Sequence, residues 1–240
     1  MKADKRLIVA LDVHAMPEMR GLVARLGDSA GYYKVGMELF YSVGAEAIRY
    51  LRQAGKDVFL DLKLHDIPNT VAHSARVLTR LGVTMFNVHA AGGTKMMKAA
   101  AEAVAEEAAA LHIEKPRLIA VTVLTSLGGS EWESLNHRLP IAEQVVSLAK
   151  LAKASGLDGV VASPQEAAAV RAACGPDFLI VTPGVRPRGA EQGDQSRTAT
   201  PGGALKDGAS HLVVGRPITK ADNPVAAVEM ILREMEVAFS

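Results

Sequence analysis

The segment VFLDLKLHDIPNT, residues 58–70, begins as an apolar run and ends in charged and turn-forming residues. A short run of this kind is typical of a buried strand, and Pro68 indicates that the strand has ended by that point. Strand alternation places Asp61 and Lys63 on one face and the leucines beside them on the other. Because the leucines suit contact with helices, we expect Asp61 and Lys63 to point to the opposite side of the sheet.

Similar apolar runs recur along the chain and, with Val58 to Leu62, predict eight strands. The other seven runs are Leu7 to Leu11, Tyr32 to Met37, Thr84 to His89, Leu118 to Leu124, Gly159 to Ala162, Phe178 to Thr182 and His211 to Gly215. Stretches with helical character lie between them, such as Met37 to Gln53, Asn69 to Leu81, Lys95 to Leu111 and Ile141 to Ala154. Regular alternation of strands and helices indicates a parallel sheet.

These repeats predict an α/β fold, a (β/α)8 TIM barrel that forms a single domain over residues 1–240. From Asp12 to Gly215 the chain makes seven repeats of about 29 residues, enough for a strand, a helix and two short loops. An open doubly wound sheet could show the same alternation. Eight units and the absence of a GxGxxG motif after the first strand favour the barrel.

Composition excludes several classes of partner. The chain has 240 residues, a net charge of +1 and only 4% aromatic residues, so it offers no basic surface or stacking platform for polymeric nucleic acid. Cys174 is the single cysteine and cannot form an internal disulfide, and no apolar run is long enough for a signal peptide or a membrane span. We expect a reduced, cytoplasmic protein without membrane contact.

Oppositely charged residues follow the first three predicted strands. Asp12 ends the first run, Lys34 lies in the second, and Asp61 and Lys63 end the third, with Asp66 in the loop beyond. A D-x-K-x-x-D pattern alone is as compatible with a structural ion pair as with catalysis. Because charges are costly to place together without a use, their convergence at the carboxyl ends of barrel strands favours an active site.

Two glycine- and arginine-containing blocks follow the seventh and eighth runs, where barrels often bind phosphate. They are VTPGVR, residues 181–186, and VGRPI, residues 214–218. Arg186 and Arg216 could each bind phosphate oxygens in a bidentate manner, although both could also be plain surface charges. The connection 184–199 has no apolar periodicity, which predicts a mobile lid.

Other polar residues give weaker signals. His65, His73 and His89 do not form a convincing ligand set, so we expect no metal. Thr125 and Ser126 follow the fifth run and could contact a ligand only through their position at the mouth. No G-x-S-x-G motif occurs, and Cys174 lies in an Ala-rich helical stretch, so nucleophilic catalysis by serine or cysteine has no support.

Taken together, the motifs resemble orotidine 5'-phosphate decarboxylases of the bacterial type. The matching segments span nearly the whole chain in family order: LIVALD (7–12), KVG (34–36), FLDLKLHDIPNT (59–70), NVHA (87–90), VTVLTS (121–126), VTPGVRP (181–187), GDQ (193–195) and VGRPIT (214–219). Of these, DLKLHDIPNT is highly specific, whereas VGRPIT alone indicates only a phosphate-binding barrel. The stretch Leu127 to Leu139 has no role that the resemblance transfers.

The resemblance implies a homodimeric carboxy-lyase that converts orotidine monophosphate to uridine monophosphate (UMP) and carbon dioxide, the last step of de novo pyrimidine biosynthesis, without cofactor or metal. It implies a charged network with Lys63 as proton donor, and an Asp and a Thr that reach into the partner's site. The implied network residues are Lys34, Asp61, Lys63 and Asp66. The implied substrate contacts are Asp12 and Lys34 on the ribose, Thr125 and Ser126 near the base, Arg186, Gln195, Gly215 and Arg216 on the phosphate, and also Asp61, Thr70 and Pro183. Asp66 and Thr70 are the two residues implied to reach into the partner's site.

Chemistry agrees with this assignment. Loss of carbon dioxide from the pyrimidine C6 leaves an electron pair in the ring plane, which requires an adjacent cation and prompt protonation. Lys63 can supply both. Two alternatives stay open: a magnesium-dependent sugar-phosphate decarboxylase or aldolase-like relative with a similar D-x-K-x-x-D, and a non-catalytic barrel that binds nucleotide phosphates.

Overall fold

A computed structural model of the chain describes residues 3–187 and 198–236. Among these residues, eight strands match the eight apolar runs. They are β1 (Leu7–Leu11), β2 (Tyr32–Gly36), β3 (Asp57–Leu64), β4 (Met85–His89), β5 (Arg117–Val121), β6 (Gly159–Val161), β7 (Leu179–Thr182) and β8 (His211–Val214).

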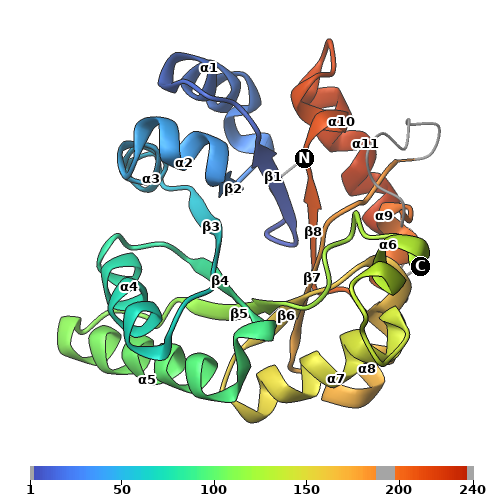
Figure 1. Ribbon diagram of the computed structural model, residues 1–240. Coiled ribbons are helices and arrows are strands. Elements are labelled where there is room, and N and C mark those ends of the chain that lie inside the picture. Colours follow the sequence, from blue (N-terminus) through green and yellow to red (C-terminus); the bar gives the residue numbers. More distant parts are fainter. Residues whose placement is uncertain (1–2, 188–197, 237–240) are drawn as a thin grey trace.

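Helices connect the strands and lie outside them (Figure 1). They are α1 (Met16–Leu26), α2 (Met37–Val43), α3 (Glu46–Gln53), α4 (Pro68–Arg80), α5 (Gly93–Leu111), α6 (Gly129–Ser134), α7 (Ile141–Ala154), α8 (Ala167–Cys174), α9 (Pro201–Lys206), α10 (Arg216–Thr219) and α11 (Pro224–Glu236). Short 3-10 turns occupy Gly27–Ser29, Ala90–Gly92 and Pro164–Glu166.

The sheet closes on itself, which confirms the barrel and excludes the open sheet. Each strand pairs in parallel with the next, and β8 returns to β1 with Val213 opposite Ile8. A parallel strand in such a ring is covered on both faces. Side chains of β1 show this directly, because Ile8 and Ala10 pack inside the barrel while Leu7, Val9 and Leu11 pack toward the helices. Burial on both sides explains why the runs are continuously apolar.

A small inner core fills the barrel. Its eight buried residues come from seven of the strands: Ile8, Ala10, Tyr32, Phe59, Met85, Ile119, Val181 and Val213. A much larger cluster lies between the strands and the surrounding helices. Filling the interior with side chains makes the barrel a packed scaffold, so a ligand site has to lie at an end of the strands.

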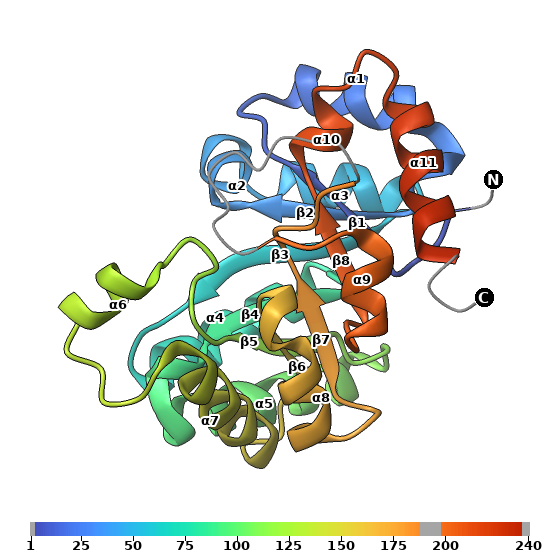
Figure 2. The same cartoon turned by 90° about the vertical axis from the view of Figure 1, so that its right-hand side faces the viewer.

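Some element boundaries differ from those predicted. The stretch Met37 to Gln53 is two helices, because the chain breaks at Gly44, which has a φ of 63°. The strand predicted to reach Leu124 ends at Val121, and the three short helices α6, α9 and α10 had no sequence signal strong enough to place them. Helix α6 lies within the stretch that the family resemblance left without a role, and it projects beyond the barrel (Figure 2).

Two glycines give opposite expectations for the same substitution. A Cβ on Gly159 would lie 2.3 Å from the Leu179 carbonyl oxygen of the paired strand, whereas a Cβ on Gly21, in helix α1, would meet nothing within 4 Å. We expect Gly159→Ala to lower the free energy of unfolding by about 1–3 kcal/mol through overpacking. Gly21→Ala should raise it by about 0.5–1 kcal/mol. Urea unfolding of both variants checks this, and a shift in the same direction for both would contradict it.

Candidate active site

Strand β3 leaves regular pairing at the segment that carries the DxK motif. The register with β4 advances four residues along β3, from Leu60 to Leu64, while it advances only two along β4. Within this bulge Lys63 has a φ of 55°, a left-handed conformation that non-glycine residues seldom adopt. Asp61 and Lys63 contact each other as predicted, but a bulge rather than simple strand alternation brings them together.

Four charged side chains form a row of alternating sign at the carboxyl ends of β1, β2 and β3. Lys63 Nζ lies 2.8 Å from Asp61 Oδ1, and Lys34 Nζ lies 3.6 Å from Asp61 Oδ2. Lys34 Nζ also lies 3.2 Å from Asp12 Oδ1. The side chains of Lys34 and Asp61 are only 13% and 14% exposed, so the middle of the row is shielded from water while Asp12 remains half exposed.

Asp61 is ionised despite its burial. Removal from water raises the pKa of this carboxyl, but Lys34, Lys63 and hydrogen bonds from Lys63 and Asn87 outweigh that cost and hold the pKa below its usual value. The carboxylate thereby keeps a permanent negative charge between two ammonium groups. The Lys63 ammonium is therefore held 2.8 Å from a fixed negative charge.

Two glycines leave room for the outer part of the row. A Cβ on Gly36 would lie 3.0 Å from Lys34 Nζ, and a Cβ on Gly215 would lie 3.0 Å from Asp12 Oδ2. Gly215 was predicted as a phosphate contact. In the structure it lies against Asp12, so its lack of a side chain also serves the charged row.

Asn87 is the site residue that the sequence did not single out. It lies in the middle of β4 between Phe86 and Val88 and is 1% exposed. Its Nδ2 donates to Asp61 Oδ1 at 2.7 Å, and its Oδ1 accepts from the Lys63 backbone N–H at 2.8 Å. The available signal was a single amide within an otherwise apolar strand run, inside the segment NVHA.

A cavity of about 170 Å³ lies beside the charged row. Five of the predicted site residues line it, from β2, β3 and the segments after β5 and β7: Lys34, Asp61, Lys63, Thr125 and Pro183. The rest of its lining is apolar and comprises Phe59, Val121, Val123, Leu124, Val161, Val181 and Val213. The cavity therefore offers one charged edge and an apolar floor, which suits a small ligand whose reacting group faces the lysines.

Two arginines lie after β7 and β8. Partial burial lowers the pKa of Arg186, and the positive charge of nearby Arg216 adds to this effect. Arg186 Nη1 donates to the carbonyl of Val185 at 3.0 Å. Neighbouring guanidinium groups that repel each other form a favourable place for an anion. Gln195, predicted to join them, lies outside the described residues.

Some predicted residues lie outside this cavity. Asp66 and Thr70 are exposed beyond the end of β3, where Asp66 Oδ1 accepts the Ile67 backbone N–H at 2.6 Å. Ile67 itself is 66% exposed. Ser126 is likewise exposed and does not line the cavity, although its neighbour Thr125 does. Within one chain, therefore, the DxK residues and the second acid of the motif face different surroundings.

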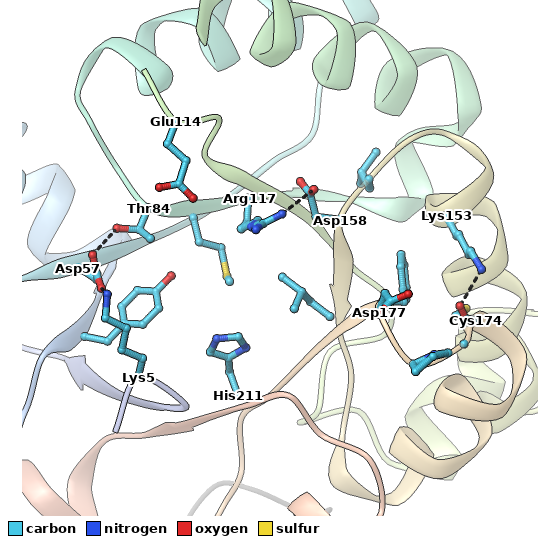
Figure 3. Close-up of a pocket in the computed structure, with 17 residues that line it drawn as sticks. Lys5, Asp57, Thr84, Glu114, Arg117, Lys153, Asp158, Cys174, Asp177 and His211 are labelled. Carbon is cyan, nitrogen blue, oxygen red and sulfur yellow. Dashed lines mark hydrogen bonds and ion pairs between the residues drawn. The ribbon is translucent and has the colours of Figure 1, made fainter. Parts of the chain in front are cut away.

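A larger cavity, about 660 Å³, lies at the opposite end of the barrel and is lined in part by the first residues of β2, β3, β5, β7 and β8. Lys5, Asp57 and Thr84 lie on one side of it, and Lys153, Asp177 and Cys174 lie on the other (Figure 3). Lys5 pairs with Asp57 at 2.9 Å. Because catalytic groups of these barrels gather at the carboxyl ends of strands, we assign this end to stability and the smaller cavity to function.

Within residues 3–187 and 198–236, no group of three or more His, Cys, Asp or Glu side chains is arranged to hold a metal ion. The rings of His65 and His89 lie 5.4 Å apart, while His73 is on α4. Over the same residues, no helix has the length and hydropathy of a membrane span.

Comparison with known proteins decides the family. The model of the orotidine 5'-phosphate decarboxylase / HUMPS family matches residues 5–231. The chain belongs to this family. It is 56% identical over 241 residues to the orotidine 5'-phosphate decarboxylase of Moorella thermoacetica, covering 99% of this chain and 94% of that protein, and 50% identical to the one of Pelobacter propionicus, covering 98% and 96%.

Solved structures agree with this family assignment. The crystal structure of orotidine 5'-phosphate decarboxylase from Lactobacillus acidophilus superposes with a TM-score of 0.85 at 46% identity, covering 97% of this chain and 99% of that one. A protein of Geobacillus kaustophilus, described as uncharacterized, gives a TM-score of 0.83 at 40% identity, covering 95% and 99%. The resemblance inferred from the motifs and the (β/α)8 fold are both confirmed.

His211, in the larger cavity, makes stability depend on pH. Burial lowers the pKa of His211 to about 4; nearby Asp4 raises it, and Arg117 and Arg6 lower it further. As the pH falls from about 6.5 to 4, the unfolded chain gains a proton that the folded chain does not, so the free energy of unfolding decreases by up to about 3 kcal/mol. We expect His211→Phe to remove this part of the decrease.

Urea unfolding of the wild type and His211→Phe at several pH values between 7 and 4 measures the effect. All other titrating groups are shared, so the difference in stability between the two proteins should shift in favour of the variant as the pH falls. A difference that stays constant with pH would show that His211 does not titrate in this way.

Proposed function

We propose that this protein catalyses the decarboxylation of orotidine 5'-monophosphate to UMP and carbon dioxide, the last step of de novo UMP biosynthesis. The observation that supports this most is the row Asp12, Lys34, Asp61 and Lys63 at the edge of an apolar cavity. Family membership and relatives of that name at about 50% identity over the full chain support the same reaction. The enzyme is then a carboxy-lyase whose whole chain forms one barrel domain.

Lys63 is the proton donor in this proposal. The bond between C6 and the carboxylate breaks, its electron pair stays on C6, and the Lys63 ammonium delivers a proton to that carbon. The neutral amine then regains a proton from solvent. A fixed ammonium beside the developing charge also stabilises the transition state electrostatically. Neither metal nor cofactor is needed, because the leaving electron pair is captured by the proton.

Asp61 has two effects on this step. Its negative charge, with Oδ1 2.8 Å from Lys63 Nζ, holds the lysine ammonium at the edge of the cavity. It also lies at the cavity edge where the substrate carboxylate would be placed, so repulsion between the two anions would disfavour the bound ground state and would disappear when carbon dioxide leaves. Lys34 compensates part of the charge of Asp61.

The remainder of the nucleotide binds around this centre. Asp12 and Lys34 bind the ribose, Thr125, Ser126 and Pro183 surround the base, and Arg186, Gln195, Gly215 and Arg216 bind the phosphate. Phosphate binding favours closure of the loop 184–199 over the substrate, so that remote binding energy is expressed in the transition state. Residues 188–197 of this loop lie outside the described residues, and closure remains a prediction.

We further propose a cytoplasmic homodimer in which Asp66 and Thr70 complete the site of the partner subunit. Both are exposed in the single chain, together with Ile67, and neither lines the cavity beside Lys63. In a two-fold dimer, one such segment serves each of the two sites.

The reaction is tested by following pyrimidine absorbance while purified protein acts on orotidine 5'-monophosphate in buffer with a metal chelator. We expect full turnover, and we expect Lys63→Ala to lower kcat by a factor of at least about 10² to 10⁴ while UMP still binds. Lys95→Ala, a change on helix α5 outside the site, is the matched control. Turnover that disappears with the chelator would favour the magnesium-dependent relative, and a wild type that binds UMP without turnover would favour the non-catalytic barrel.

The shared site is tested with a hybrid dimer of two inactive chains, Lys63→Ala and Asp66→Asn, co-expressed with different tags. If Asp66 acts across the interface, the hybrid has one site with both native residues and should recover about half of the wild-type activity. If Asp66 acts within its own chain, both sites of the hybrid are defective and no activity returns. A chain that runs as a monomer in gel filtration would contradict the dimer itself.

A further inference from the structure

Asn87 occupies a position where an apolar residue would be the ordinary choice. It lies in β4, is 1% exposed, and has the fully buried Phe86 and Val88 as chain neighbours. Burying an amide costs free energy unless its donor and acceptor are both satisfied. Both are satisfied here by groups of the charged row, which ties the presence of Asn87 to that row rather than to the general packing of the barrel.

One amide holds the two residues of the DxK motif at the same time. Nδ2 donates to Asp61 Oδ1 at 2.7 Å, and this oxygen also accepts from Lys63 Nζ at 2.8 Å. Oδ1 of Asn87 accepts the backbone N–H of Lys63 at 2.8 Å. The side-chain amide therefore fixes the carboxylate at one end and the backbone that carries the lysine at the other.

The hydrogen bond from the Lys63 backbone N–H to Asn87 lies where regular pairing between β3 and β4 is interrupted. Because β3 advances four residues against two of β4 between Leu60 and Leu64, regular ladder pairing is interrupted across the bulge. Lys63 has a φ of 55° there, which a non-glycine residue adopts only when its surroundings hold it. Asn87 lies opposite this interruption and bonds to the backbone N–H of the strained residue.

We propose that Asn87 is a positioning residue for the decarboxylation: it fixes the bulge of β3 and the Asp61 carboxylate together, and thereby sets the point from which Lys63 Nζ delivers its proton. This inference rests on the proposed function. Asn87 does not line the cavity and does not contact substrate in this proposal. Its effect should therefore appear in the chemical step and not in nucleotide binding.

Asn87→Leu tests the proposal by keeping the number and branching of the side-chain heavy atoms and removing both hydrogen bonds. We expect kcat to fall by a factor of about 100, the order of loss that follows a misplacement of about 1 Å at a reacting centre. The KM for orotidine 5'-monophosphate and the Kd for UMP should change by less than about threefold, because the phosphate and ribose contacts are elsewhere. Thr79→Val is the control, since Thr79 is also fully buried but bonds only within its own helix, to the carbonyl of Ala75.

Asn87→Asp tests the proposal through the pH dependence of kcat, which a purely structural role of Asn87 would leave unchanged. A protonated carboxyl reproduces the donor and acceptor of the amide, whereas an ionised one loses the donor and repels Asp61. Burial beside Asp61 raises the pKa of the introduced carboxyl, so its protonation should occur within a measurable range. We therefore expect the ratio of variant to wild-type kcat to rise as the pH falls.

The outcomes separate this inference from the function on which it rests. A wild type without decarboxylase activity would defeat the proposed function. With an active wild type, an Asn87→Leu variant that loses thermal stability to the same extent as Thr79→Val but keeps kcat within about threefold would overturn the positioning role. If Asn87→Leu does not fold, the ratio for Asn87→Asp decides, and a ratio that is independent of pH overturns the proposal.

Discussion

The Asp61 carboxylate is the group on which the rest of the site depends. Its two oxygens are shared among Lys63 Nζ at 2.8 Å, Asn87 Nδ2 at 2.7 Å and Lys34 Nζ at 3.6 Å. An isolated carboxylate in this place would cost several kcal/mol, and the three partners together outweigh that cost, with Lys34 and Lys63 contributing most. The partners come from β2, β3 and β4, three consecutive parallel strands that bring their side chains to one point of the barrel. The charged row therefore depends on the barrel both to bring its residues together and to hold them in place.

Packing inside the barrel supplies the rigidity that such a row needs. Phe59, Val181 and Val213 belong to the inner core and also form part of the apolar floor of the cavity. Because interiors of this kind are close-packed, a shift of the floor would require several strands to move together. The charged groups therefore rest on side chains that cannot move individually. Among the strands that the structure describes, the pairing of β3 with β4 carries the register shift, and this bulge lies beside the cavity.

Sequence patterns predicted the fold and the gathering of opposite charges at one end of the barrel, because both depend on information local to each strand. Apolar runs record burial on both faces, and the spacing of Asp61 and Lys63 indicated one shared face, although the bulge of β3 is what brings the two side chains together. The bulge was not predicted, since Lys63 is not a residue type that signals a positive φ, and the helix break at Gly44 was hidden by apolar periodicity on both sides of it. The role of Asn87 was missed for a different reason: it depends on the register of a neighbouring strand, which one strand's sequence does not contain.

The two ends of the proposed ligand meet protein charges of different kinds, and this difference explains how binding could drive chemistry. Around Asp61 the charges already neutralise one another, so a substrate carboxylate placed there gains little and is repelled in part. Arg186 and Arg216 lie at the other end of the ligand, where partial burial and repulsion from the positive charge of Arg216 lower the pKa of Arg186. A phosphate would relieve that repulsion, while the carboxylate would bear the unfavourable contact with Asp61. Binding free energy gained at the arginines would then hold the reacting group in a place that becomes favourable only once carbon dioxide has left.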